Sequence, residues 1–201
     1  MAKTDKQIII TISREYGSGG KEIGEKLAQR LGINFYDKKL IEEAAKAEGI
    51  PKNAFNTIES GNLLPFASGY TPETDDVEHY RQAQVIIALA AKEESFVIVG
   101  RCADSELKGM KDSLNIFIYA PLEERIKRVQ KYLGADANEN QIRREIARVD
   151  TIRRRFHNRY SYTKWGMREG YDILIDSSIL GIDGTVDLLE KMVKEHFEIE
   201  G

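Results

Sequence analysis

Short runs of β-branched and aromatic residues recur along the chain, separated by longer stretches with helical periodicity. The runs are nearly continuous in Ile, Val and Phe, whereas a strand with one exposed face would alternate with polar residues. Such runs are typical of a parallel sheet that crossover helices cover on both faces. The pattern predicts a doubly wound α/β fold with strands at residues 7–13, 33–36, 96–100, 114–120 and 171–176.

The helical stretches between these runs carry clear start and stop signals. The first places Ile23, Leu27 and Leu31 on one side, and Gly32 is well placed to end it. Residues 38–92 are different, because helical patterns at both ends enclose a part rich in Gly, Pro, Ser and Asn. This segment predicts an inserted helical lobe. Near the end of the chain, residues 181–184 predict a turn before a terminal amphipathic helix.

Composition narrows the class of protein. The 201 residues fit a single domain, and 33 acidic against 30 basic residues argue against a protein that coats nucleic acid. No apolar run approaches the roughly 20 residues that span a bilayer, so the sequence predicts no membrane partner and a place in the cytosol. Cys102 is the only cysteine, which excludes an intramolecular disulfide. The three histidines have no metal-ligand spacing, so we expect no dedicated metal site.

A glycine-rich loop joins the first strand to the first helix. Successive backbone amides and a helix N-terminus in this context can cradle a phosphate group. We therefore expect phosphate binding by Arg14, Gly17, Ser18, Gly19, Gly20, Lys21 and Glu22. A glycine-rich turn without a ligand is the alternative.

The loop departs from the full Walker pattern G-x-x-x-x-G-K-[ST]. If Lys21 were its lysine, Glu15 and Glu22 would replace the first Gly and the final Ser or Thr. In small nucleoside monophosphate kinases the lysine lies seven residues before the Leu of a Leu-Ala-x-x-Leu-Gly helix end. Counting back from Leu27 puts Gly20 at the lysine position and Lys21 at the hydroxyl position. Either the loop rearranges so that Lys21 reaches the phosphates, or a basic residue such as Arg14 supplies the charge.

Residues 143–159 hold seven arginines but only two acidic residues, Glu145 and Asp150. As one helix, this stretch would bury a stripe formed by Ile142, Ile146, Val149, Ile152 and Phe156. Arg153 falls within that stripe, and an inward guanidinium needs an anion. Phosphoryl transfer requires such groups. The alternatives are a solvated helix in which Asp150 pairs with Arg153 or Arg154, and a nucleic-acid surface, which the acidic remainder of the chain disfavours.

Several motifs in one order resemble the cytidylate kinase-like family over nearly the whole chain. The motifs are Ile-Ser-Arg-Glu-Tyr-Gly-Ser-Gly-Gly at 12–20, Phe-Tyr-Asp at 35–37, Val-Ile-Val-Gly-Arg at 97–101, Ala-Pro-x-Glu-x-Arg at 120–125, and Tyr-Asp-Ile-Leu-Ile-Asp at 171–176. The resemblance implies a P-loop NTPase-like fold with a five-stranded parallel core, a helical monophosphate-binding insertion and an arginine-rich lid. One domain would then comprise a core (7–37, 93–133, 170–201), the insertion (38–92) and the lid (134–169).

The resemblance also implies transfer of the γ-phosphoryl group of ATP to CMP or dCMP, with magnesium arriving on the nucleotide. By position, Asp37 would open the monophosphate lobe, and Arg101, Arg125 and Arg128 would bind the acceptor. Asp150 and Arg153 match the lid element, with Arg153 bridging the donor and acceptor phosphates. Lys21 and Arg154 complete the expected catalytic group.

Two departures keep other functions open. In cytidylate kinases an Asp follows the Gly-Arg pair, whereas Cys102 follows it in this chain. Asp104 is the nearest acidic residue that could take the place of that Asp. The lysine of the loop is also out of register. A nucleotide-binding regulatory protein or pseudokinase without turnover is therefore an alternative, and so is a kinase for another small phosphate acceptor.

Overall fold

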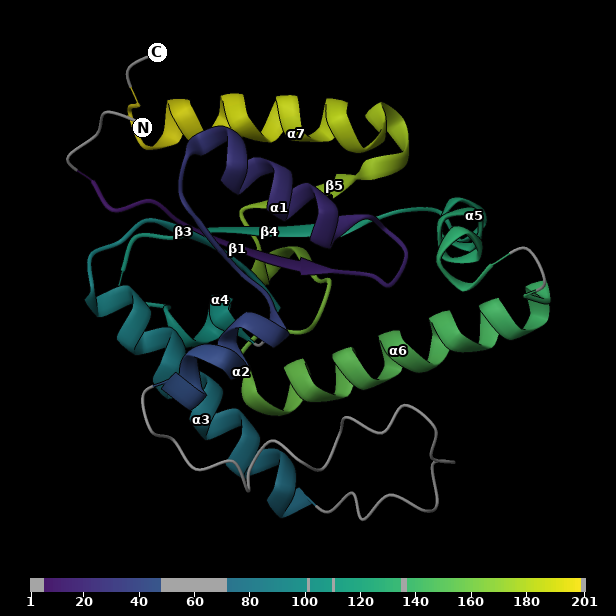
Figure 1. The fold of residues 1–201 in the computed structure, drawn as a ribbon, viewed down its shortest axis with the longest axis horizontal. Coiled ribbons are helices and arrows are strands. Elements are labelled where there is room, and N and C mark those ends of the chain that lie inside the picture. Colours follow the sequence, from purple (N-terminus) through teal and green to yellow (C-terminus); the bar gives the residue numbers. More distant parts are fainter. Residues whose placement is uncertain (1–5, 48–71, 101, 110, 135–136, 200–201) are drawn as a thin grey trace.

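Five parallel strands form one sheet in the order β2-β3-β1-β4-β5 (Figure 1). The computed structural model describes residues 6–47, 72–100, 102–109, 111–134 and 137–199. The strands are β1 Ile9–Arg14, β2 Asn34–Tyr36, β3 Phe96–Val99, β4 Leu114–Tyr119 and β5 Ile173–Asp176. Each predicted strand is present within a few residues of its expected ends. The prediction of a doubly wound α/β sheet is confirmed.

Helices connect the strands and lie on both sides of the sheet (Figure 1). They are α1 Gly20–Leu31, α2 Lys38–Ala47, α3 Pro72–Ala91, α4 Ala103–Glu106, α5 Leu122–Leu133, α6 Glu139–Tyr160 and α7 Ser177–His196, with a short 3-10 helix, η2, at Arg168–Gly170. The middle of the predicted insertion, residues 48–71, lies outside the described residues.

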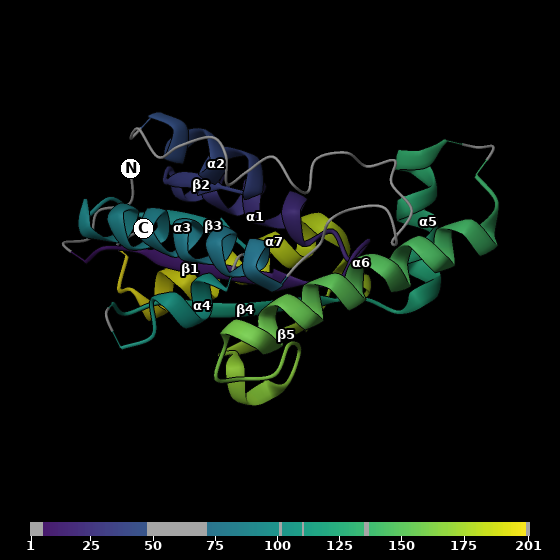
Figure 2. The same cartoon turned by 90° about the horizontal axis from the view of Figure 1, so that it is seen from below.

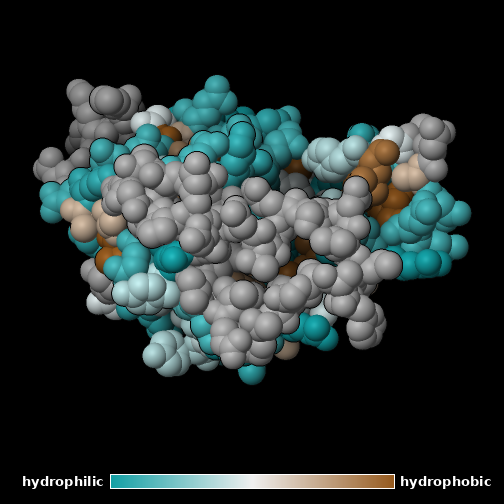
Figure 3. All heavy atoms as spheres, turned by 60° about the horizontal axis from the view of Figure 1, so that its bottom comes forward, coloured by the Kyte–Doolittle hydropathy of each residue, from teal (hydrophilic) through white to brown (hydrophobic). Residues whose placement is uncertain are grey.

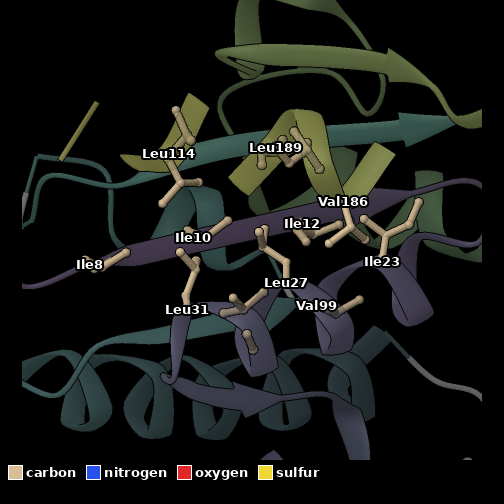
Figure 4. Close-up of a cluster of buried hydrophobic side chains, with 14 of the residues drawn as sticks. Ile8, Ile10, Ile12, Ile23, Leu27, Leu31, Val99, Leu114, Val186 and Leu189 are labelled. Atoms are coloured by element: carbon tan, nitrogen blue, oxygen red, sulfur yellow. The ribbon is translucent and has the colours of Figure 1, made fainter. Parts of the chain in front are cut away.

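The alternation of side chains along β1 assigns the two faces of the sheet. Ile10 and Ile12 pack with α1 and α7, through side chains such as Leu27 and Leu189 (Figure 4). Ile9 points the other way, into a cluster supplied by α2, α3 and α4. Because helices cover both faces of the sheet, the side chains on both sides of a central strand are buried and mostly apolar. This explains the continuous apolar runs of the sequence.

Helix α5 and the start of α6 pack together beyond the carboxyl end of β1 (Figure 1). Ile126 and Val129 of α5 pack against Ile142 and Ile146 of α6, and Tyr16 of the glycine loop joins this cluster. Figure 2 shows α6 running diagonally below the sheet from α5 toward the β5 side. The arginine-rich segment is therefore one long helix that contacts the loop.

The buried face of α6 differs from the predicted stripe in its second half. Ile142 and Ile146 are buried as expected, but the buried positions continue with Asp150 and His157. Ile152, which the prediction placed inside, is 44% exposed. The second half of α6 thus turns a different face inward than the hydrophobic pattern predicts. It does so because Asp150 and His157 have buried polar partners, described below, and a pattern of apolar residues does not reveal such partners.

The predicted turn at 181–184 is present at its first residue. Gly181 has a non-helical backbone, with φ 68° and ψ −175°, and it divides Ser177–His196 (α7) into a short first part and a long terminal helix. Thr185 donates its hydroxyl hydrogen to the Gly181 carbonyl at 2.6 Å, which supports the kink. Gly181 thus separates the two helical parts of α7, and the longer part is the terminal helix that the sequence predicted.

The surface on the α6 side is mostly hydrophilic where its residues are coloured, with small apolar areas (Figure 3). One brown area lies toward the end of the molecule where Figure 1 places α5. The exposed large apolar side chains of α5 include Tyr132 and Leu133. Among the described helices, none is long and apolar enough to cross a membrane.

Candidate phosphate-binding site

The glycine loop leaves β1 at Arg14 and enters α1 at Gly20 through two left-handed residues. Gly17 has φ 82° and Gly19 has φ 83°, a region in which glycine carries no steric penalty. A β-carbon on Gly17 would lie 2.9 Å from both the Arg125 carbonyl oxygen and Val129 Cγ2. Glycine at this position therefore lets the loop lie directly on α5.

Three arginines hold the outer side of the loop by its carbonyl oxygens. Arg153 Nη1 donates to the Arg14 carbonyl at 3.2 Å, and Arg125 Nη1 to the Tyr16 carbonyl at 3.4 Å. Arg128 Nη1 donates to the Ser18 carbonyl at 2.7 Å. Alternate carbonyls from residue 14 to 18 are thus bound by cations from α5 and α6.

The amides at the start of α1 are candidates for binding a ligand. No described residue accepts a hydrogen bond from the amides of Gly17, Gly19, Gly20 or Lys21, and the first backbone bond of α1 runs from the Ile23 amide to the Gly19 carbonyl. Gly19 supplies no side-chain cap. These amides and the helix dipole together favour an anion.

Arg125 and Asp150 form the buried centre of this arrangement. Arg125 Nη1 lies 2.5 Å from Asp150 Oδ2, and Asp150 Oδ1 accepts the Tyr16 amide at 2.7 Å. Their side chains are 11% and 9% exposed, so each charge depends on the other. The alternative pairing of Asp150 with Arg153 or Arg154 is therefore corrected, because its ion-pair partner comes from α5.

Glu15 adds a second carboxylate beside Arg125. In the sequence, Glu15 stands out only as a departure from the Walker pattern. Its Oε2 lies 3.4 Å from Arg125 Nε and accepts the Ala120 amide at 3.3 Å. Burial raises the pKa of Glu15 above its ordinary value, although Arg125 and the Ala120 amide act in the opposite direction. Glu15 thus ties the loop to the end of β4.

Ser18 and Arg128 fix the loop from the β5 side. Ser18 is fully buried, and its amide and hydroxyl both donate to the Glu15 carbonyl, at 3.3 and 2.9 Å. Arg128 also donates to the Ser177 hydroxyl at 2.8 Å, and that hydroxyl donates to the Ser18 carbonyl at 2.6 Å. The hydroxyl of Ser18 is therefore used inside the loop, and Ser177 is a site residue that the sequence did not indicate.

Lys21 points away from the loop. Its Nζ lies 2.7 Å from Asp37 Oδ2, and the lysine side chain is 61% exposed. Burial pushes the pKa of Asp37 upward, but hydrogen bonds from Lys21 and from the Leu40 amide outweigh it, and the net pKa is lower than usual. The structure thus brings together two predicted residues, Lys21 and Asp37, as an ion pair at the entrance to α2.

The remaining predicted residues lie around this centre or outside the described chain. The Arg154 guanidinium lies 5.5 Å from the ring centre of Trp165, and that of Arg153 lies 5.5 Å from the ring centre of Tyr16. Glu22 pairs along α1 with Lys26 at 3.0 Å. Arg101 lies outside the described residues.

A second polar cluster lies further along α6, and sequence reasoning missed it. His157 Nε2 is 2.9 Å from Asp104 Oδ2, and both residues are buried. The Tyr171 hydroxyl is 3.4 Å from the same nitrogen, and burial raises the pKa of that tyrosine. Of these three residues, only Asp104 stands out in the sequence, as the nearest acidic residue after the Gly-Arg pair at 100–101.

Known proteins resemble this chain along most of its length. A cytidylate kinase of Methanopyrus kandleri is 27% identical over 202 residues, 96% of this chain and 96% of that protein. An uncharacterised protein from Eubacterium ventriosum has a solved structure with a TM-score of 0.74 and 31% identity, covering 94% of this chain and 99% of that one. A shikimate kinase of Acinetobacter baumannii shares the fold at a TM-score of 0.52 and 15% identity, covering 96% of this chain and 94% of its own.

The family model for the cytidylate kinase-like family matches residues 9–179. This match begins at the first residue of β1 and extends into α7. It includes the glycine loop, both arginine-bearing helices and Asp37. The chain therefore belongs to the cytidylate kinase-like family.

Proposed function

We propose that the chain transfers the γ-phosphoryl group of ATP to a nucleoside monophosphate, with CMP or dCMP as the acceptor. The observation that carries the proposal is the glycine loop, whose amides at the start of α1 have no described acceptor while arginines hold its carbonyls. Family membership supports the coarser part, a phosphotransferase of the nucleoside monophosphate kinase class. The cytidylate kinase relatives support the finer part, the acceptor.

The reaction needs no covalent intermediate with the protein. An oxygen of the acceptor monophosphate attacks the γ-phosphorus, and the bond from that phosphorus to the bridging oxygen breaks. The electron pair of that bond leaves with ADP, and the acceptor becomes a diphosphate. Because the attacking oxygen is already anionic, catalysis depends on positioning and on neutralising charge.

The residues of this chain would divide that work. The amides from Gly19 to Lys21 would bind the phosphates of the donor, since they lie at a helix N-terminus without described partners. Arg153 lies beside the loop between Tyr16 and the Arg14 carbonyl, where it could neutralise charge between donor and acceptor. Asp150 would keep the loop and Arg125 in place, as a positioning residue.

The acceptor site would lie between the loop and the insertion. Asp37 stands at the start of α2, and Arg101 follows the end of β3 in the sequence. Arg125 and Arg128 are engaged with the loop, so their proposed role in acceptor binding is indirect. Arg101 and Asp37 are the proposed acceptor contacts.

Position 21, where the Walker pattern has a magnesium-binding hydroxyl, holds a lysine paired with Asp37. Among the described residues, no group of three or more His, Cys, Asp or Glu could hold a metal ion. Magnesium would therefore be carried by the phosphates of the nucleotide. A location in the cytosol stays a prediction from the sequence.

One observation favours a second function, nucleotide binding without turnover. The only lysine of the loop is engaged with Asp37 at 2.7 Å, and Gly20 occupies the position of the Walker lysine. A protein of this kind would gain stability from ATP, because a ligand that binds only the folded state stabilises it. It would form no diphosphate.

An assay of the purified chain with ATP, magnesium and a panel of monophosphates tests the proposal. We expect diphosphate formation with CMP or dCMP, and Arg153→Ala should lower kcat by about a hundredfold or more, as for loss of a transition-state donor. Arg155→Ala is the matched control, since Arg155 is exposed on the same helix. A thermal shift with ATP but no diphosphate from any acceptor would support the binding protein. Diphosphate from a different phosphorylated acceptor would reassign the substrate.

A further inference from the structure

Two glycines far apart in the sequence leave space for one side chain, that of Arg14. A β-carbon on Gly20 would lie 2.6 Å from Arg14 Cβ and 3.0 Å from its Cγ. A β-carbon on Gly100 would collide with Arg14 Nη1 and would lie 3.3 Å from its Cζ. The Arg14 side chain therefore runs from the end of β1, past the first residue of α1, to the end of β3.

The sheet explains this path. Arg14 is the last residue of β1 and is in phase with Ile10 and Ile12, whose side chains face α1. Strand β3 is the neighbour of β1, and the Gly100 amide donates to the Ile12 carbonyl at 2.9 Å. The guanidinium of Arg14 thus lies at the carboxyl edge of the sheet, on the face that carries the glycine loop. Ligands of open α/β sheets bind outside this edge.

Arg14 and Gly20 occupy two linked positions of the Walker pattern. In G-x-x-x-x-G-K-[ST] the first Gly lies six residues before the Lys. With Gly20 at the lysine position, six residues back is Arg14, and the intervening Gly19 matches. Relative to the Walker pattern, the basic residue and the glycine have exchanged positions. The basic side chain, Arg14, starts at the end of the strand, and the glycine, Gly20, is the first residue of the helix.

The contacts agree with this exchange. A lysine at position 20 would begin at the point that the Arg14 stem now fills, 2.6 Å from Arg14 Cβ. Lys21 is directed elsewhere, to Asp37 at 2.7 Å. We propose that Arg14 replaces the Walker lysine, and that its guanidinium binds the β- and γ-phosphate oxygens of the nucleotide. This rests on the proposed function only in taking the ligand to be a nucleoside polyphosphate.

The geometry dictates the variants for a test. Arg14→Gly removes the cation together with its β-carbon, which a lysine at position 20 would otherwise meet. Arg14→Gly/Gly20→Lys restores both positions of the Walker pattern. Arg14→Met keeps an apolar stem beside Gly20 without the charge. Arg168→Ala is the matched control, because its side chain is 87% exposed and pairs with the neighbouring Glu169.

The first readout is the ratio of AMP to ADP dissociation constants, measured by calorimetry, since only ADP carries a β-phosphate. We expect the wild type to prefer ADP, and Arg14→Gly and Arg14→Met to lower this preference by about tenfold or more, as for a lost charge-assisted hydrogen bond. Arg14→Gly/Gly20→Lys should recover most of it. Melting temperatures identify variants that fail to fold, and Arg14→Met provides the measurement if Arg14→Gly does so.

The outcomes separate this inference from the proposed function. An ADP preference that disappears in Arg14→Met and returns in Arg14→Gly/Gly20→Lys supports the role of Arg14 even if no monophosphate is phosphorylated. An unchanged preference in folded Arg14→Met overturns it, even if the wild type is an active kinase. A wild type that binds ADP no tighter than AMP overturns it as well. A second readout, kcat with the best acceptor, should follow the same order of variants.

Discussion

Helix α6 contacts the rest of the molecule in two different ways along its length. In its middle, Asp150 and Arg153 bind the glycine loop, a segment with amides that have no acceptor among the described residues. Toward its end, His157 binds Asp104 of α4, and the ring of Tyr160 stacks on His79 of α3 at 3.9 Å between ring centres. The middle contacts set the shape of the proposed binding site, and the terminal contacts join one helix to two others.

The two parts of α6 thus have different roles, one beside the glycine loop and one in packing against α3 and α4. Asp150 and His157 are both buried polar residues on the same face of α6. Asp150 accepts hydrogen bonds from a loop amide and from an arginine of α5, so we expect a change there to alter the proposed phosphate site. His157 contacts Asp104 and Tyr171, which lie on the other side of the sheet from α1. We therefore expect a substitution at Asp150 to lower both stability and activity, and a substitution at His157 to lower mainly stability.

Asp150→Ala should have the largest effect. It leaves the Arg125 guanidinium buried without its main anion and removes the acceptor of the Tyr16 amide, so we expect a loss of about 3 kcal/mol or more in the free energy of unfolding. Nucleotide binding and turnover should fall as well, because the loop loses its support. Urea unfolding and calorimetry measure the two effects.

A matched control for Asp150 is Glu145→Ala on the same helix. Glu145 pairs with Arg148 at 2.7 Å, and that arginine is 55% exposed. An exposed pair of this kind contributes about 0.5 kcal/mol or less. Equal losses in the two variants would show that the buried position of Asp150 has no special role.

His157→Phe should have the next largest effect, on stability more than on turnover. It leaves the carboxylate of Asp104 buried without a partner, and we expect a loss of about 2–3 kcal/mol. Adding Asp104→Ala should recover part of this loss, since an apolar pair of similar volume avoids the unpaired charge. The measurement is a double-mutant cycle by urea unfolding, with kcat measured for each folded variant.

A loss of turnover in His157→Phe as severe as in Asp150→Ala would contradict the separation between the two parts of α6. Strict additivity of the two substitutions in the cycle would show that His157 and Asp104 are not coupled.

Lys21→Met should have the smallest effect, on the side of the loop away from α6. The Lys21–Asp37 pair is partly exposed, so we expect a loss of less than about 1 kcal/mol at pH 7. Folding lowers the pKa of Asp37 below 3.8, so this contribution is complete above that pH and is lost as the pH falls through the folded-state pKa. Urea unfolding of wild type and variant between pH 7 and pH 3 should show the difference shrinking. A difference that grows toward acid would contradict the assignment.

The sequence by itself determined the sheet and most helix limits, and it indicated the region of the proposed site. Continuous apolar runs indicated strands buried on both faces, and Gly32 lies at the end of α1 as its backbone preference predicts. The glycine loop was identifiable because a phosphate site needs close backbone approach at a helix start. These are local properties, so a single segment carries enough information to reveal them.

Tertiary structure decided which charges meet and where each long side chain goes. The hydrophobic pattern placed Ile152 inside α6, but the partners of Asp150 and His157 come from α5, the loop and α4, and they rotate the helix to bury those two instead. Arg14 and Lys21 flank the loop at the end of β1 and the start of α1, yet Lys21 extends to Asp37 and Arg14 crosses Gly20 to reach Gly100. A flexible charged side chain has many rotamers and little local preference, so its direction follows only from the neighbours that the fold assembles.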